Sequence, residues 1–127
     1  MKRTPVVTSK APGAIGPYSQ GISSGEMVFV SGQTPLKADG NMAPGGVAEH
    51  TEQCLANVRE VLIAAGLTMN DVVKTTVFMT DLGQFAAMNE VYAKHFTGTP
   101  PARSTVQVAR LPRDAKIEIE VIAQVRS

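Results

Sequence analysis

The pattern of apolar and polar residues divides the first third of the chain into two strand-like runs and a loop. Segments 17–23 (PYSQGIS) and 26–32 (EMVFVSG) flank Ser24–Gly25, a short turn signal, and predict a β-hairpin. The next segment, 33–46 (QTPLKADGNMAPGG), concentrates Pro, Gly, Asn and Asp and predicts a loop. A further short strand is expected at Val6–Val7.

The apolar period becomes helical between residues 47 and 65. Apolar residues recur three and four positions apart, and Gly66 supplies the stop signal. This stripe consists of Leu55, Val58, Leu62 and Ala65. Residues 72–80 (VVKTTVFMT) follow, rich in β-branched and aromatic side chains, and predict a buried strand.

A second helix is expected over residues 81–96. Asp81 and Gln84 stand at the spacing of a capping box at its start. One face of this helix gathers Phe85, Met88, Tyr92 and Phe96. Two closing strands are expected at roughly 103–109 and 116–125, because apolar and polar residues alternate there.

The element order is therefore β-β-α-β-α-β-β, with the short strand at Val6–Val7 in front of it. Two amphipathic helices and one mixed sheet predict an α+β fold with both helices packed on one face of the sheet. The 127 residues suit a single domain spanning 1–127, and no linker or repeat suggests a boundary.

The two closing strands carry the charged residues of interest. In 117–125, alternate residues form a continuous apolar face that must carry the helices, while Glu118, Glu120 and Ile122 point the other way. In the preceding strand Arg103 and Thr105 share one side. If these strands pair as a hairpin through 111–114 (LPRD), Arg103 lies on the same side of the sheet as the glutamates.

The register of that hairpin stays open. Pairing Thr105 with Glu118 places Arg103 opposite Glu120, and a shift of the turn pairs Thr105 with Glu120 instead. The mixed face that carries Ile122 predicts contact with a second copy of the chain. The alternative is a sheet side that simply faces solvent.

Arg103 also has two interpretations. An arginine in a partly desolvated cleft binds a carboxylate through two parallel hydrogen bonds. Alternatively it forms an ordinary ion pair with Glu118 or Glu120. Nearby segments favour a ligand site, since GPYSQG (16–21), VSGQT (30–34) and PPARS (100–104) each combine Gly or Pro with hydroxyl or amide groups.

Composition narrows the function classes. Twelve basic and eleven acidic residues give a net charge of +1, which offers no footprint for nucleic acid. Cys54 is the single cysteine, so no disulfide within the chain forms, and it is expected to be a small core residue. Without a signal-like apolar start or a membrane-length apolar run, we expect a soluble, cytoplasmic protein that does not enter membranes.

Familiar catalytic motifs are absent from the sequence. His50 and His95 fall in helical segments without a second histidine at i+4, so they match no zinc motif and are expected to be structural or solvated. No phosphate-binding glycine loop, dinucleotide fingerprint or serine-nucleophile elbow occurs. What remains is an arginine that can bind a substrate carboxylate and a glutamate that can act on water. These groups suit a substrate that is already electrophilic and easily attacked by water.

Several segments together resemble the Rid/YjgF family, the reactive intermediate deaminases, also called enamine/imine deaminases. They cover essentially the whole chain in the family's order. The segments are GPYSQG (16–21), VSGQTP (30–35), NVREVLIAAG (57–66), DVVKTTVFMTDL (71–82), MNEVY (88–92), PARSTVQVARLP (101–112) and IEIEVIA (117–123).

The resemblance implies a chorismate-mutase-like α+β fold assembled as a homotrimer, with three clefts between subunits. It implies hydrolysis of 2-aminoacrylate and related 2-imino acids to 2-keto acids and ammonia, with no cofactor or metal. The family's carboxylate-binding arginine falls on Arg103 and its water-orienting glutamate on Glu118, which favours the Glu118 register. Further cleft residues are implied at Tyr18, Ser31, Gly32 and Asn89.

One position departs from the family pattern. Many members carry cysteine two residues after the arginine, where this chain has Thr105, so only a substrate contact is expected there and no thiol chemistry. The segment between Asn89 and Arg103 also looks shorter than in some relatives, which would alter the preference for substrate size. Other functions associated with the family are keto-acid binding or regulation, a ribonuclease activity and a chaperone-like role. Near-neutral charge and the lack of a histidine acid/base pair disfavour the ribonuclease.

Overall fold

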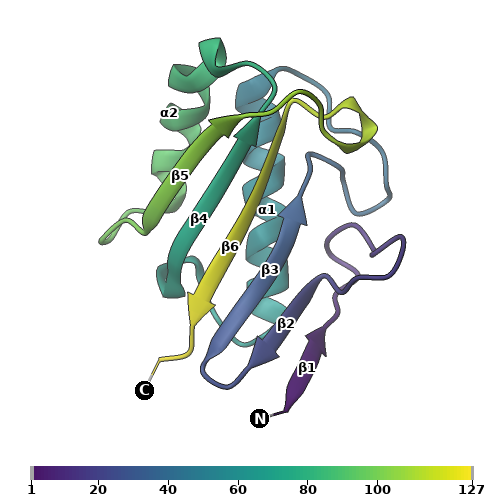
Figure 1. Ribbon diagram of the computed structural model, residues 1–127, viewed down its shortest axis with the longest axis vertical. Helices are drawn as coiled ribbons and strands as arrows, with labels where there is room; N and C mark the ends of the chain where they lie inside the picture. The colour runs from purple at the N-terminus through teal and green to yellow at the C-terminus, as the bar shows by residue number, and fades with distance from the viewer. Residues whose placement is uncertain (1, 127) are drawn as a thin grey trace.

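The computed structural model of the chain describes residues 2–126. Within these residues, six strands form one mixed sheet in the order β1-β2-β3-β6-β4-β5, and two α-helices lie behind it (Figure 1). The strands are β1 (Arg3–Val6), β2 (Gly21–Ser24), β3 (Met27–Gln33), β4 (Val72–Met79), β5 (Ala102–Gln107) and β6 (Ile117–Gln124). The helices are α1 (Val47–Ala64) and α2 (Phe85–His95).

The predicted elements and their order are confirmed. The first hairpin pairs Ser24 with Met27 across the turn, where Gly25 adopts a φ of 59°. The short leading strand runs from Arg3 to Val6 and pairs antiparallel with β2. The loop 33–46 contains a single isolated bridge, Leu36 to Met42, among the described residues.

Helix α1 forms the centre of the core. Leu55, Val58 and Leu62 of the predicted stripe are completely buried against the sheet. The helix ends where expected, because Gly66 takes a φ of +82°, a conformation that favours glycine. Leu67 N then donates to the Leu62 carbonyl at 2.8 Å, which closes the last turn.

Helix α2 starts later than its sequence signal suggests. The Asp81 carboxylate accepts a hydrogen bond from Gly83 N at 2.8 Å, so it caps a short 3-10 turn (Leu82–Gln84) that precedes the α-helix. Met88 and Tyr92 are buried as predicted. Phe85 is 37% exposed and lies at the edge of the core.

The predicted hairpin between the last two strands is wrong. β6 lies between β3 and β4 and pairs antiparallel with both, whereas β5 occupies the sheet edge and pairs parallel with β4. Helix α2 supplies the crossover that a parallel β4–β5 pair requires. Alternating polarity defines the two faces of a strand but not its neighbours, which is why either closing strand fitted the pattern.

The predicted orientation of Arg103 is also wrong. Arg103 and Thr105 align with Thr75 and Val77 of β4, two residues that are completely buried beneath the helices. Aligned residues in a parallel pair point to the same face. Arg103 therefore lies on the helix side of β5, while Glu118 lies on the opposite face of the sheet.

That opposite face is left uncovered by the helices (Figure 1). Phe29 of β3 is 44% exposed there, beside its β6 partner Ile122, and Val106 of β5 is 41% exposed. Patches of this kind are typical of surfaces that meet another protein. None of the helices in the described part of the chain is long and apolar enough to cross a membrane.

Candidate active site

The predicted site residues other than Thr105 fall into two clefts. The first, called the glutamate cleft, has a volume of about 680 Å³ and opens between the loop before β2, the end of β3 and the start of β6. It brings together four of the predicted site residues: Tyr18, Ser31, Gly32 and Glu118. Glu120 lines it as well.

A bulge in β3 shapes this cleft. The register between β3 and β6 shifts between Val30 and Gln33, which takes Ser31 and Gly32 out of the regular ladder. Ser31 Oγ donates to the Ser19 carbonyl at 2.6 Å, and Ser31 N donates to the Gln20 carbonyl at 3.0 Å. Ser31 thus ties the loop that carries Tyr18 to the edge of the bulge.

Gly32 is required by its contact with Glu118. A Cβ placed on Gly32 would lie 2.7 Å from Glu118 Cδ and 2.9 Å from Oε2. Every other residue would push the carboxylate away, since such distances are well inside van der Waals contact. The absence of a side chain at Gly32 therefore lets the Glu118 carboxylate lie against the β3 backbone.

The environment of Glu118 favours its protonated form. Burial raises the pKa of the Glu118 carboxyl above its ordinary value, and the neighbouring Glu120 carboxylate raises it further. Arg103 of the same copy does not oppose this shift, because it lies on the other face of the sheet. A carboxyl with a raised pKa is better suited to accept a proton and return it than one with an ordinary pKa.

The second cleft, called the arginine cleft, lies between α2 and β5 and has a volume of about 470 Å³. Arg103 NH1 donates to Asn89 Oδ1 at 2.7 Å. The guanidinium carbon lies 4.7 Å from the centre of the Tyr92 ring and 5.4 Å from that of Phe85. These contacts orient the guanidinium and leave donors for an anion.

The alternative of an ion pair between Arg103 and Glu118 or Glu120 does not occur within one chain. Among residues 2–126, three ion pairs form, and Arg103 belongs to none of them. Instead an amide oxygen and two aromatic rings hold the charged guanidinium. An anionic ligand would find this charge uncompensated.

Sequence reasoning missed the role of Tyr92 and Phe85 beside the arginine. Tyr92 Oη and Thr75 Oγ1 lie 2.8 Å apart and form a buried hydrogen bond that fixes the ring under Arg103. Burial is the main reason that the pKa of Tyr92 is raised. The signal was present, because positions 85, 89 and 92 lie on one helix face and include Asn89.

Thr105 lies two residues from Arg103 on the helix side of β5. Its Oγ1 is buried and has no hydrogen-bond partner within the described residues. It lines neither cleft in the single chain. The predicted substrate contact of Thr105 therefore stays a prediction.

The other chemically active side chains have structural partners away from both clefts. His50 Nε2 donates to the Ala43 carbonyl at 2.8 Å. His95 bridges the helices, with Nε2 2.9 Å from Glu52 Oε2 and Nδ1 3.1 Å from Arg59 NH2. Cys54 is buried in the core, and burial raises the pKa of its thiol. No three His, Cys, Asp or Glu side chains of residues 2–126 are grouped so that they could hold a metal ion.

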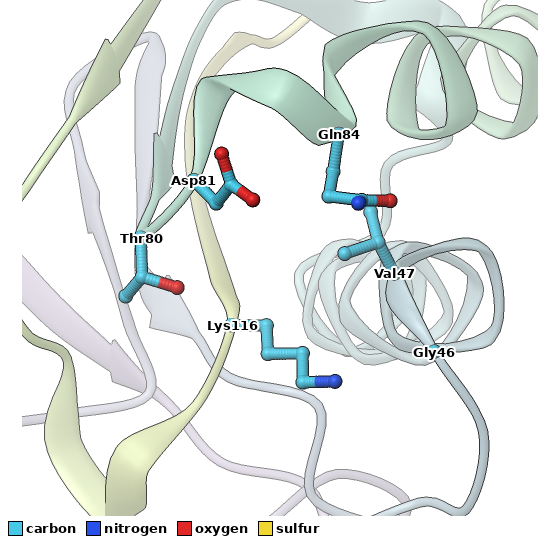
Figure 2. A pocket seen from close by; sticks show the side chains of 6 residues that line it. All are labelled: Gly46, Val47, Thr80, Asp81, Gln84 and Lys116. Carbon is cyan, nitrogen blue, oxygen red and sulfur yellow. The ribbon is translucent and has the colours of Figure 1, made fainter.

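A third cleft of about 270 Å³ lies at the start of α1 (Figure 2). The Lys116 side chain extends toward the first turn of this helix, with Asp81 and Gln84 on the other side (Figure 2). These three side chains are exposed, and Asp81 is already occupied in capping Gly83. None of the predicted site residues lines this cleft.

The two clefts that do hold predicted site residues are separate within one chain. Strand β4 lies between β5, which carries Arg103, and β6, which carries Glu118. The two side chains also point to opposite faces of the sheet. A small substrate therefore cannot contact both residues of the same copy.

The chain is similar to known proteins over nearly its whole length. The family described as Endoribonuclease L-PSP matches residues 8–125. A 2-iminobutanoate/2-iminopropanoate deaminase from Escherichia coli is 50% identical over 93% of this chain and 94% of its own length. The mouse protein of the same name is 48% identical over 95% of this chain and 90% of its own length.

A solved structure supports the same relationship. The crystal structure of Escherichia coli TdcF with bound serine superposes with a TM-score of 0.91 at 50% identity, and the match covers 98% of this chain and 99% of that one. Sequence and fold therefore agree over nearly the whole chain. The protein belongs to the Rid/YjgF family, whose model carries the description Endoribonuclease L-PSP.

Proposed function

We propose that this protein is a hydrolytic deaminase that converts 2-aminoacrylate and related 2-imino acids to 2-keto acids and ammonia. The relatives named 2-iminobutanoate/2-iminopropanoate deaminase, at about half identity over nearly the full chain, support this reaction. The single observation that carries it is a guanidinium that pairs with no carboxylate of residues 2–126. Asn89 and Tyr92 hold it, and it can bind the carboxylate of a small ligand.

We further propose that the complete site forms between two copies of the chain. Each copy offers an arginine cleft at the β5 edge and a glutamate cleft on the uncovered face, and the two do not meet within one copy. The exposed apolar residues Phe29, Val106 and the adjoining Ile122 supply the contact surface. Packing against a neighbour would bring its Arg103 to Glu118 and complete the site.

In a closed ring of copies, every glutamate cleft faces an arginine cleft of a neighbouring copy. If each copy gives its arginine edge to one neighbour and receives another's at its glutamate cleft, a ring holds one complete site per chain. The resemblance to the family supports a homotrimer as that ring. Three chains of 13.4 kDa correspond to about 40 kDa, which light scattering after size exclusion measures directly.

The reaction follows from these parts. Arg103 binds the substrate carboxylate in a bidentate manner and fixes C2 of the protonated imine. Glu118 of the neighbouring copy accepts a hydrogen bond from a water molecule and aligns it on C2. As the water oxygen bonds to C2, one of its protons passes to Glu118, which gives a neutral carbinolamine.

The same carboxyl then completes the cycle. Its proton passes to the amino nitrogen, the C–N bond breaks, and ammonia leaves while the C2 hydroxyl becomes the keto group. The hydroxyl proton is released and taken up by ammonia, so one imine and one water yield one keto acid and one ammonium ion. Since a protonated imine is strongly electrophilic, positioning supplies most of the acceleration.

A ribonuclease has less support from the structure. His50 and His95 are buried and bonded to Ala43 and to Glu52 and Arg59, and neither lines a cleft that holds predicted site residues. The near-neutral charge of the chain offers no general attraction for a phosphate backbone. A keto-acid-binding protein without turnover would use the same clefts and differs only in the outcome of the assay below.

The test generates imino acids in place with an amino-acid oxidase and follows the decline in semicarbazone that hydrolysis causes. Arg103→Ala should lower kcat/KM by about 100-fold or more, because a charge-assisted bidentate contact is lost. Arg110→Ala is the matched control, since Arg110 pairs with Asp114 on the surface. Unchanged activity in Arg103→Ala would refute the clamp, and tight keto-acid binding without turnover in the wild type would establish the binding protein.

A further inference from the structure

One wall of the glutamate cleft is an irregular loop. The loop of residues 7–19 lies between β1 and Gln20, the residue before β2. Two of its large apolar side chains lie at the cleft, Ile15 at 84% exposed and Tyr18 at 53% exposed. Of the residues in this loop, Ala11 alone is buried. Packing into the core therefore does little to hold the wall in place.

Hydrogen bonds from the side chain of Gln20 hold this loop in place. Gln20 is only 4% exposed. Both the oxygen and the nitrogen of its side-chain amide form hydrogen bonds with the backbone of the loop. Oε1 accepts from Thr8 N at 2.8 Å, while Nε2 donates to the Thr8 carbonyl at 3.0 Å and to the Pro12 carbonyl at 2.9 Å. One buried amide thus fixes a segment eight to twelve residues earlier in the chain.

The other end of the loop is tied separately. Ser31 Oγ binds the Ser19 carbonyl, and Tyr18 N donates to the Gly16 carbonyl at 2.9 Å in a turn where Gly16 has a φ of +119°. Ile15 N approaches Tyr18 Oη at 3.4 Å, a long contact. Ile15 therefore stands on a short span between the Gln20 bonds and the Ser31 bond.

We propose that Gln20 is a positioning residue that holds Ile15 at the cleft, and that Ile15 selects the side chain of the substrate. This inference rests on the proposed function, because it assigns the C2 substituent of the imino acid to the wall formed by Ile15. An aliphatic side chain there favours alkyl substituents over charged ones and stabilises longer alkyl chains more than short ones. The selectivity of the enzyme then depends on a buried amide that does not react.

The binding of keto acids of increasing chain length tests the roles of Ile15 and Gln20 without requiring turnover. Calorimetry gives the Kd of pyruvate, 2-oxobutanoate and 4-methyl-2-oxopentanoate for the wild type, Ile15→Ala, Gln20→Glu and the double variant. Ile15→Ala changes an exposed residue and should weaken binding of the longest acid by about tenfold while pyruvate changes little. Gln20→Glu should give the same pattern, because a carboxylate faces two carbonyl oxygens where an amide donated.

Two further readouts separate positioning from stability alone. If Gln20 acts through Ile15, the double variant should bind no worse than Gln20→Glu, a non-additive result. Binding by Gln20→Glu, relative to the wild type, should also recover at low pH, where the protonated carboxyl donates again. Gln84→Glu is the control, since Gln84 is exposed and lines neither the glutamate cleft nor the arginine cleft.

Equal binding of all three acids by the wild type would overturn the proposal, and so would unchanged Kd values in Ile15→Ala. Additive effects in the double variant would show that Gln20 acts on something other than Ile15. If Gln20→Glu does not fold, Ile15→Ala with Gln20→Met, which fills the same space without polar atoms, repeats the comparison. Turnover of imino acids by the wild type is measured separately, so failure of the proposed function is distinguishable from failure of this inference.

Discussion

Replacing Gly32 with alanine should damage catalysis with little effect on folding. The new Cβ would lie 2.7 Å from Glu118 Cδ, whereas carbon atoms in contact are about 3.5–4.0 Å apart, so the carboxyl must retreat by about 1 Å. A misplacement of that size in a catalytic group can reduce the rate by about 100-fold. We therefore expect kcat/KM to fall by about 100-fold in Gly32→Ala.

The folding cost should be small, because the displaced group is the end of a flexible side chain. Removing a glycine also stabilises a protein by about 0.4–1 kcal/mol through the unfolded chain, which offsets part of the strain. Calorimetric melting with the imine assay measures both effects. Gly13→Ala is the matched control, since Gly13 lines the same cleft and a Cβ there meets no atom within 4 Å. Full activity in Gly32→Ala, or equal losses in both variants, would refute the reasoning.

Three further predictions address the arginine platform, the glutamate and the assembly surface. Tyr92→Phe leaves the buried Thr75 hydroxyl unpaired, so the free energy of unfolding should fall by about 1–3 kcal/mol and KM should rise several-fold. If neither quantity changes, Tyr92 does not position Arg103. In single chains, which the Ile122→Glu variant described below should supply, the pKa of Glu118 is raised. The folded chain then keeps that proton to a higher pH than the unfolded chain, and the stability it contributes is lost as pH rises through the folded pKa. Urea unfolding across this pH range should show a decline that is absent in Glu118→Gln, and parallel curves would contradict it. Ile122→Glu on the uncovered face should convert the assembly to single chains of 13.4 kDa by light scattering, and an unchanged mass would exclude that face as the interface.

The elements of the fold followed from local signals. The helical spacing of Leu55, Val58 and Leu62 requires a buried face, and Gly66 ends the helix because its φ is positive. The alternation in 117–124 correctly separated the apolar face from the face of Glu118. Such patterns report which side of an element is buried, and this was sufficient for the α+β fold.

Strand neighbours were beyond the reach of these patterns. The partner of β5 is decided by the crossover through α2, and the loop before β6 contains Arg113 and Asp114 with φ values of 61° and 54°, which no alternation reveals. The error moved Arg103 to the wrong face of the sheet. It also suggested that Arg103 and Glu118 of one chain meet, although the resemblance to the family had already implied clefts between subunits.

Within each cleft the sequence predictions fared better. Tyr18, Ser31, Gly32 and Glu118 do line one cleft, and Asn89 and Arg103 the other. The contribution of Gln20 was missed because a glutamine in a loop has no distinctive pattern, whereas that of Tyr92 was missed although it shares a helix face with Asn89. Their roles depend on the hydrogen bonds to Thr75 and Thr8, which join distant parts of the chain.

A mixing experiment tests most directly whether the active site is shared between copies. Arg103→Ala and Glu118→Ala should each be inactive alone, because each lacks one half of every site. Mixed in equal amounts under conditions that exchange subunits, half of the donated arginines and half of the receiving glutamates are intact, so about a quarter of the sites should be complete in a cyclic assembly. Recovery of about a quarter of wild-type activity is the predicted result. Exchange confirmed by mass spectrometry with no recovered activity would contradict the shared site.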